Sequence, residues 1–392
     1  MPKPIYIEAK RIITPNESLD NSCVLVNENG IIDYVGRKEE VPNNQFEKLI
    51  VPDLWLSPGL IDLHNHGGNG ISLGEGDDPA EDLRAHSKWL IETGVTGFLA
   101  SISAPTKQIT AEIIKKLIPV FEEPAQGARP LGLHLEGMFI SHEKIGAFVP
   151  EWLRLPDLEE ARECINYAKG WIKQVTMAPE LPNAMEVARE FKNAGATIAM
   201  GHSNCEYELA KKALSGDFTH VTHMFNALSG FNHRAPGAVG AILTSEKVTA
   251  ELIADGVHIH PAAMKLLLKC LGKDRIVLIT DAIKGAGLPD GIYEEFGLRI
   301  CVKNGKATDE GGGLAGSVAM LNKCVKNMHE LTGASVQDAI CMATQNPAKV
   351  IGYDNKIGSI SAGKAADLIL FDESFNVRLT MVGGEILFNN LE

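Results

Sequence analysis

The sequence predicts an α/β protein: a (β/α)8 TIM barrel with a small β-sandwich domain formed by both termini. Three observations lead to this prediction. The middle of the chain alternates apolar β-branched runs with helix-like stretches, both ends are rich in short β-like runs, and polar residues recur where the predicted strands end. We expect the small domain to comprise residues 1–57 and 353–392, and the barrel residues 58–352.

The two ends of the chain supply the predicted small domain. Each end carries three β-rich runs, at residues 5–7, 23–26, 31–35, 366–371, 377–382 and 385–388. Asn29-Gly30 and Gly383-Gly384 are typical of turns between such strands. Because both ends have the same character and flank a long middle, we expect them to pair in one domain.

The middle of the chain supplies the predicted barrel. Its apolar, β-branched runs lie at residues 60–64, 95–100, 130–135, 172–177, 197–200, 220–222, 248–253 and 276–279. Helix-like stretches between them include residues 80–92, 184–193, 207–214 and 262–270. An open doubly wound sheet would normally carry a Gly-rich nucleotide loop after its first strand. His-Asn-His-Gly-Gly occupies that place, at residues 64–68, so the closed barrel is favoured.

Polar residues mark the C-terminal ends of these strands, the barrel face that carries active sites. They are His64, His66, Glu136, His202, His223, His258 and Asp281. His64 and His66 are two residues apart, so in a strand both imidazoles point to one face. This alignment predicts a metal site. We interpret His86, His142, His220, His260 and His329, which lack such placement, as surface residues or neighbours of the ligands.

The ligand types indicate the chemistry. Neutral imidazoles with a carboxylate suit a divalent ion, one or two per subunit, with zinc favoured and iron as the alternative. Such an ion lowers the pKa of bound water towards ~7, and Glu136 can bridge two ions ~3.5–4 Å apart. Asp281 can take the proton of the water and deliver it to a leaving group. The chain lacks a Gly-x-Ser-x-Gly motif, so we expect a metal-assisted hydrolase of amide-like bonds.

The sequence resembles the amidohydrolase superfamily and, within it, the N-acetylglucosamine-6-phosphate deacetylases. The resemblance runs nearly end to end. Its motifs are Pro58-Gly-Leu-Ile-Asp-Leu-His-Asn-His-Gly67, His134-Leu-Glu-Gly137, Met200-Gly-His-Ser203, Thr222-His-Met-Phe-Asn-Ala227, Arg234-Ala-Pro-Gly237, Leu252-Ile-Ala-Asp-Gly-Val-His258, Thr280-Asp-Ala282, Gly287-Leu-Pro-Asp-Gly291 and Leu314-Ala-Gly-Ser317. It implies deacetylation of N-acetylglucosamine 6-phosphate to glucosamine 6-phosphate and acetate.

The resemblance also implies roles for individual residues. Glu136, His202 and His223 bind a metal with Asp281 as acid/base, and His64 and His66 hold a second metal. The substrate contacts map onto Ala147, Phe148, Asn226, Ala227, Arg234, His258, Leu314, Ala315 and Gly316. An arginine fork at Arg234 matches the geometry of a phosphate. A homodimer is implied as well, with some phosphate contacts crossing its interface.

Three positions depart from the family pattern. Met138 replaces the usual Pro, Ala235 the usual Glu, and Phe148 a histidine that contacts the substrate. Because Phe148 cannot donate a hydrogen bond, either the second metal polarises the carbonyl alone or the substrate differs. Two alternatives therefore stay open. One is a deacylase for another N-acyl amino sugar, such as N-acetylgalactosamine 6-phosphate, or for an N-acyl amino acid. The other is a non-catalytic, metal-bound binding protein.

Composition restricts partners and compartment. The net charge of −13 argues against nucleic-acid binding, which favours a basic face. The seven cysteines are scattered and contain no Cys-x-x-Cys, which suits free thiols in a reducing cytosol. No signal-peptide core or membrane-length apolar run is present. We expect a cytoplasmic enzyme of a small amino sugar phosphate, without a membrane partner.

Overall fold

A parallel sheet of eight strands forms the middle of this computed structural model, which describes residues 4–14, 17–41 and 46–391. Neighbours in the sheet follow the order of the sequence. The strands are β6 (Leu60–Asn65), β9 (Val95–Ile102), β10 (Arg129–Phe139), β11 (Ile172–Met177), β12 (Thr197–Met200), β13 (Phe218–Val221), β14 (Thr249–Ile253) and β15 (Ile276–Ile279). Each of the apolar runs predicted for the barrel overlaps one of these strands.

Hydrogen bonds also connect the first and last strands of the sheet. The Asp281 N–H donates to the His64 carbonyl and the His66 N–H to the Ala282 carbonyl, both at 2.9 Å. Beneath them, the Thr280 hydroxyl donates to buried Asp62 at 2.5 Å. These bonds place β6 beside β15, as a closed barrel requires.

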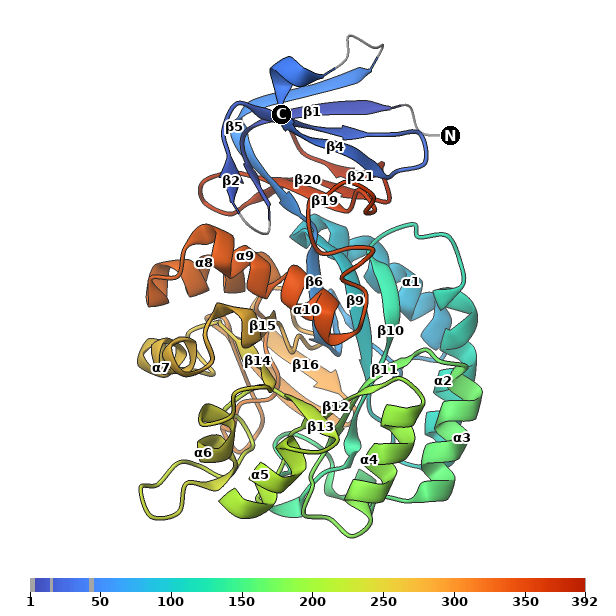
Figure 1. Cartoon of the computed structure of the whole chain (residues 1–392). Helices are drawn as coiled ribbons and strands as arrows, with labels where there is room; N and C mark the ends of the chain where they lie inside the picture. The colour runs from blue at the N-terminus through green and yellow to red at the C-terminus, as the bar shows by residue number, and fades with distance from the viewer. Residues whose placement is uncertain (1–3, 15–16, 42–45, 392) are drawn as a thin grey trace.

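Helices follow the strands on the outside of the sheet (Figure 1). They are α1 (Pro79–Leu90), α2 (Lys107–Phe121), α3 (Leu158–Ala168), α4 (Ala184–Asn193), α5 (Tyr207–Leu214), α6 (Gly237–Leu243), α7 (Pro261–Leu271), α8 (Leu321–Thr332), α9 (Val336–Met342) and α10 (Gln345–Val350). Side chains that cap the first turn help to determine where helices begin. The Asp157 side chain accepts from the Glu160 N–H at 2.8 Å, an N-cap of α3 that contributes about 1 kcal/mol. The same helix buries Ala161, Cys164 and Ala168 against the sheet.

Both ends of the chain meet in a second sheet, at the top of Figure 1. Its path runs β21-β20-β19-β5-β1-β3-β4, with β2 beside β1. The strands are β1 (Ile5–Ile13), β2 (Ser18–Leu19), β3 (Ser22–Val26), β4 (Ile32–Arg37), β5 (Glu47–Pro58), β19 (Leu368–Phe371), β20 (Val377–Val382) and β21 (Glu385–Asn389). Strand β5 pairs with β1 in parallel and with β19 antiparallel. It leads directly into β6 through Gly59, so the predicted boundary at residue 57 falls inside β5.

A small antiparallel sheet follows β15 and was not predicted from the sequence. It comprises β16 (Gly291–Glu295), β17 (Leu298–Lys303) and β18 (Lys306–Thr308). The sequence signal is weak because these strands are short and largely exposed. The β16–β17 turn is held by the Phe296 N–H, which donates to Glu75 at 2.6 Å, and by the Ser72 hydroxyl, which donates to Glu295 at 2.7 Å.

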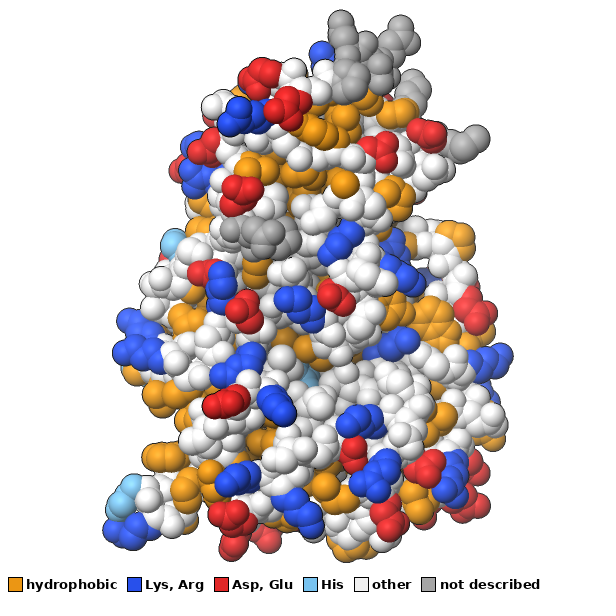
Figure 2. Space-filling model, viewed as in Figure 1, with side chains coloured by type: hydrophobic (Ala, Val, Ile, Leu, Met, Phe, Trp, Pro, Cys, Tyr) orange, Lys and Arg blue, Asp and Glu red, His pale blue; other side chains and the backbone are white. Residues whose placement is uncertain are grey.

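The surface agrees with a dispersed negative charge. Figure 2 shows acidic and basic side chains interspersed over one face of the molecule, with apolar atoms scattered between them. No helix among the described residues is long and apolar enough to cross a membrane.

Candidate active site and metal centre

Glu136 lies at the centre of the site and divides four histidines into two pairs. Its Oε2 atom is 2.8 Å from His64 Nε2 and 3.0 Å from His66 Nε2. Its Oε1 atom is 3.4 Å from His223 Nε2 and 3.6 Å from His202 Nε2. Within each pair the two Nε2 atoms are 3.0 Å apart. Each carboxylate oxygen of Glu136 therefore faces its own pair of imidazoles.

Backbone placement brings these residues together. His64 lies in β6 and His66 just after it, while His202, His223 and Asp281 follow β12, β13 and β15. Glu136 instead lies within β10, because that strand continues past the predicted end, with an irregular register between Leu135 and Phe139.

Three of these site residues adopt a left-handed backbone. The φ angles are 46° at His202, 27° at His223 and 51° at Asp281. Such non-glycine residues cost of order 1–3 kcal/mol each and cluster at functional sites, where the surrounding structure holds them. The strained positions here all carry side chains into the same centre.

Hydrogen bonds at the outer ring nitrogens fix the imidazoles. His64 Nδ1 donates to Glu251 Oε2 at 2.9 Å, and His202 Nδ1 donates to the Lys144 carbonyl at 2.7 Å. The Nε2 atoms of these rings therefore face the centre, where each lies close to Glu136. Metal-bound histidines are commonly oriented in this way by a carboxylate or a carbonyl.

The donor set fits a divalent metal. Two clusters, His64–His66–Asp281 and Glu136–His202–His223, each have ligand atoms within 4.8 Å of one another. Glu136 Oε1 is buried and has no hydrogen-bond partner among the described residues, which leaves its lone pairs for an ion. Burial and the neighbouring His223 lower the pKa of His202 to about 4, so its ring is neutral at pH 7. Imidazoles with a shared carboxylate suit zinc or iron, which bind histidine rings in their neutral form.

The charge of Glu136 is also set by its neighbours. Burial opposes ionisation, but charge on His64 and hydrogen bonds from the surrounding imidazoles hold the pKa of Glu136 well below its usual range. The group is therefore a carboxylate at neutral pH. Asp281 completes the centre, with Oδ1 3.4 Å from His64 Nε2 and 3.6 Å from His66 Nε2.

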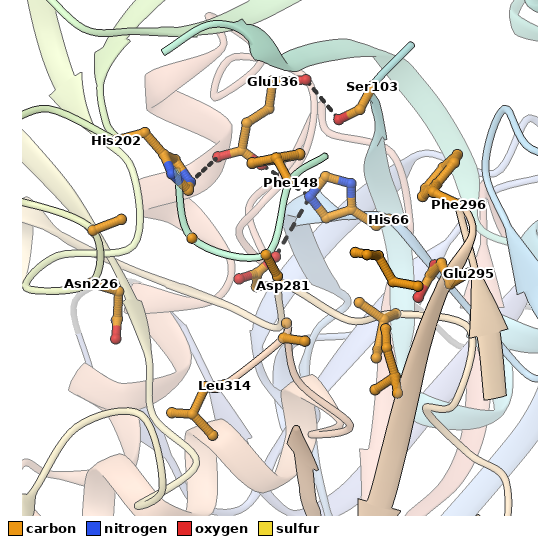
Figure 3. A pocket seen from close by; sticks show the side chains of 18 of the residues that line it. His66, Ser103, Glu136, Phe148, His202, Asn226, Asp281, Glu295, Phe296 and Leu314 are labelled. Carbon is orange, nitrogen blue, oxygen red and sulfur yellow. Dashed lines mark hydrogen bonds and ion pairs between the residues drawn. The ribbon is translucent and has the colours of Figure 1, made fainter. Parts of the chain in front are cut away.

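One pocket lies over this centre (Figure 3). Most of the predicted substrate contacts line it, namely Ala147, Phe148, Asn226, Ala227, His258, Leu314, Ala315 and Gly316. The Phe148 ring lies 5.1 Å from the His202 ring and 6.5 Å from the His66 ring, both edge-on. Gly137 makes room for it, because a Cβ there would lie 2.7 Å from the Phe148 ring.

Arg234 is the one predicted contact that lies apart. It does not line the pocket and is exposed on the loop between β13 and α6, with Nη1 2.7 Å from His233 Nε2. Phe231 on the same loop is 62% exposed. Within one chain, Arg234 therefore lies apart from the pocket that the other predicted substrate contacts line.

Glu251 is a site residue that the sequence analysis missed. It is 0% exposed, and its Oε2 accepts from His64 Nδ1 and, at 3.1 Å, from the His223 N–H. Its Oε1 accepts from Gln174 at 2.6 Å. An acidic residue inside the apolar strand β14 was the signal available in the sequence. Glu251 thus contacts one histidine of each pair.

We expect Glu251→Gln to weaken metal binding about 10- to 100-fold, because the charged acceptor that orients His64 is lost. Competition with a chelator followed by metal analysis measures this. Glu190→Gln is the control, since Glu190 pairs with Arg162 on the exterior. Equal metal affinity in the Glu251 and Glu190 variants would contradict the role given to Glu251.

Comparisons with known proteins agree with this geometry. The model of the Amidohydrolase family matches residues 55–387. The chain belongs to the amidohydrolase family. The resemblance inferred from the sequence motifs is thereby confirmed, and the chain is a hydrolase of amide bonds.

Individual relatives are similar over nearly the whole chain. The chain is 36% identical to an N-acetylglucosamine-6-phosphate deacetylase of Bacillus subtilis (strain 168), covering 100% of this chain and 99% of the relative. It is 33% identical to an N-acetylgalactosamine-6-phosphate deacetylase of Escherichia coli O157:H7, covering 97% and 98%. The crystal structure of an N-acetylglucosamine-6-phosphate deacetylase from Pasteurella multocida superimposes with a TM-score of 0.91 at 30% identity, covering 98% and 99%.

Proposed function

We propose that this amidohydrolase deacetylates N-acetylglucosamine 6-phosphate, yielding glucosamine 6-phosphate and acetate. The observation that carries the proposal is the centre in which Glu136 faces two pairs of imidazoles with Asp281 beside them. Full-length similarity to deacetylases of amino sugar phosphates supports the substrate class.

The residues of the chain perform the proton transfers and the positioning. When bound, the divalent ions supply a nucleophile at neutral pH and polarise the acyl carbonyl. Asp281 accepts the proton of the attacking water and returns it to the nitrogen of the leaving amine. Glu136 and the four histidines would hold the ions, Glu251 orients His64, and Phe148 lines the pocket over the centre.

We also propose which metal ion binds, where in the cell the protein works, and how its two sheets are arranged. We propose zinc as the ion, with iron as the alternative, and a closed (β/α)8 barrel in which the terminal sheet serves as the small β-sandwich domain. We propose for the site residues the roles that the family resemblance implies. Because no disulfide joins the described cysteines, a reducing cytoplasm fits the chain.

The position of Arg234 supports a homodimer. We propose that the loop carrying Arg234 and exposed Phe231 packs against a second subunit, where the guanidinium contacts the substrate phosphate. His258 and Asn226 line the pocket and complete the sugar-phosphate site.

The substrate assignment is tested with Arg234→Ala. We expect kcat/KM for the sugar 6-phosphate to fall at least about tenfold, because a charge-assisted fork to phosphate is lost. The unphosphorylated N-acetyl sugar should be affected much less. Arg162→Ala, which removes an exposed arginine paired with Glu190, is the control. If the parent prefers the unphosphorylated sugar and Arg234→Ala changes nothing, the sugar-phosphate assignment is wrong.

A second substrate enters the same assay. The similarity to the E. coli N-acetylgalactosamine-6-phosphate deacetylase favours the 4-epimer as the alternative. The two sugar phosphates differ only in the configuration of one hydroxyl group. The ratio of their kcat/KM values in the parent protein shows which of them is the preferred substrate.

A further inference from the structure

Glu295 is a buried acid that the mechanism above does not use. It is the last residue of β16, is 4% exposed and lies among the residues that line the pocket (Figure 3). Its Oε1 atom accepts from the Ser72 hydroxyl at 2.7 Å and from the Lys284 N–H at 3.3 Å. Its Oε2 atom has no hydrogen-bond partner in the described part of the chain.

An unpaired oxygen of this kind calls for a partner. Buried polar atoms are nearly always hydrogen-bonded, because leaving one without a partner costs free energy. Burial raises the pKa of Glu295, with a smaller opposing effect from Ser72, His66 and Lys284 and a further rise from Glu75. Both donors that reach Oε1, a hydroxyl and a backbone N–H, are neutral groups, and Oε2 offers a further acceptor position in the same surroundings.

The position of Glu295 relative to Asn226 and Asp281 indicates which half of a substrate it would face (Figure 3). In Figure 3, Asn226 and Glu295 lie on opposite sides of Asp281. The two halves of an amide extend to opposite sides of the bond that is cleaved. If the sugar occupies the side of Asn226, as the proposed function requires, the acyl group lies on the side of Glu295 and Phe296.

The pocket wall beside Glu295 is largely apolar, and contacts hold it in place. Phe148, Ile283 and Phe296 line the same pocket, and the Phe296 ring meets Trp152 edge-on at 5.3 Å. The turn is tied down because Glu75 accepts from the Phe296 N–H. In such a wall, a single hydrogen-bond acceptor such as Glu295 Oε2 can favour an acyl group that carries a hydrogen-bond donor. An acyl group of the same size without a donor would bind less well. The methyl of an acetyl group carries none.

We propose that Glu295 is a specificity residue that makes the pocket selective for N-acyl groups bearing a hydroxyl, such as the glycolyl (hydroxyacetyl) group of an amino sugar phosphate. This inference rests on the proposed function and narrows its substrate class. Hydrolysis proceeds as for acetyl: water adds to the acyl carbon, the C–N bond breaks, the amine nitrogen gains the proton, and glycolate leaves in place of acetate.

The test compares matched acyl groups on glucosamine 6-phosphate with the full-length, zinc-loaded protein. Glycolyl and propionyl have similar size and differ in the hydroxyl. We expect the parent to favour glycolyl by roughly tenfold in kcat/KM, the value of one hydrogen bond in a buried site. Glu295→Leu should bring the ratio to one or below, and Glu295→Gln, which keeps an acceptor oxygen, should retain part of it. Glu294→Gln, at an exposed position of the same strand, should leave the ratio unchanged.

The possible outcomes separate the two proposals. A parent ratio of one, or a ratio that Glu295→Leu leaves intact, overturns this inference while hydrolysis of the acetyl compound upholds the proposed function. A preference for N-glycyl over N-glycolyl overturns it as well, because the partner would then be a cation. If none of these sugar phosphates is hydrolysed, the proposed function fails and the inference fails with it. Thermal melting identifies a variant that has not folded, and Glu295→Gln then decides.

Discussion

Asp281→Asn is expected to lower kcat about 10²- to 10⁴-fold while the fold and the metal content stay unchanged. The asparagine has the same shape but cannot take a proton from water, and the six other oxygen and nitrogen donors of Glu136 and the four histidines remain. Steady-state kinetics with parallel metal analysis and thermal melting measure these quantities. Asp290→Asn, on the exposed loop before β16, is the control.

This experiment also decides the remaining alternative, a metal-bound protein without catalytic activity. A parent that hydrolyses its substrate and an Asp281→Asn variant that does not would exclude it. Activity within about tenfold of the parent would instead assign the acid/base role to another group.

His64→Asn is expected to reduce bound metal by roughly one equivalent per subunit, because the pair on the Oε2 side of Glu136 loses one of its two imidazoles. Activity should fall with it. Elemental analysis after dialysis measures the metal directly. His142→Asn is the matched control, since His142 is exposed and outside both ligand clusters. Unchanged metal content in His64→Asn would contradict the paired site.

The sequence could predict that these candidate metal ligands lie together, for a physical reason. Alternation along a strand places His64 and His66 on one face, and parallel strands bring their carboxyl ends to one edge of the sheet. His202, His223 and Asp281 could therefore be grouped without coordinates. Glu136 was found as well, although the strand continues beyond it to Phe139.

Residues outside that pattern were harder to find. Glu251 lies inside an apolar strand, and a single acidic residue there does not indicate which histidine it contacts. Glu295 lies on a hairpin whose place over the pocket depends on tertiary contacts with Ser72 and Glu75. Arg234 belongs to a family motif, but it does not line the pocket of its own chain. The spacing of residues along the sequence does not reveal that Arg234 and the pocket lie apart.

The pairing of β5 has a consequence for synthesis on the ribosome. One side of β5 can pair with β1 as soon as both have emerged, but the other side waits for β19, which follows the whole barrel segment in the chain. Until then β5 presents an open edge, which nascent chains must shield from association with other strands. Because β5 leads directly into β6, the segment that carries His64 is made well before the strand β19 that completes the pairing of β5.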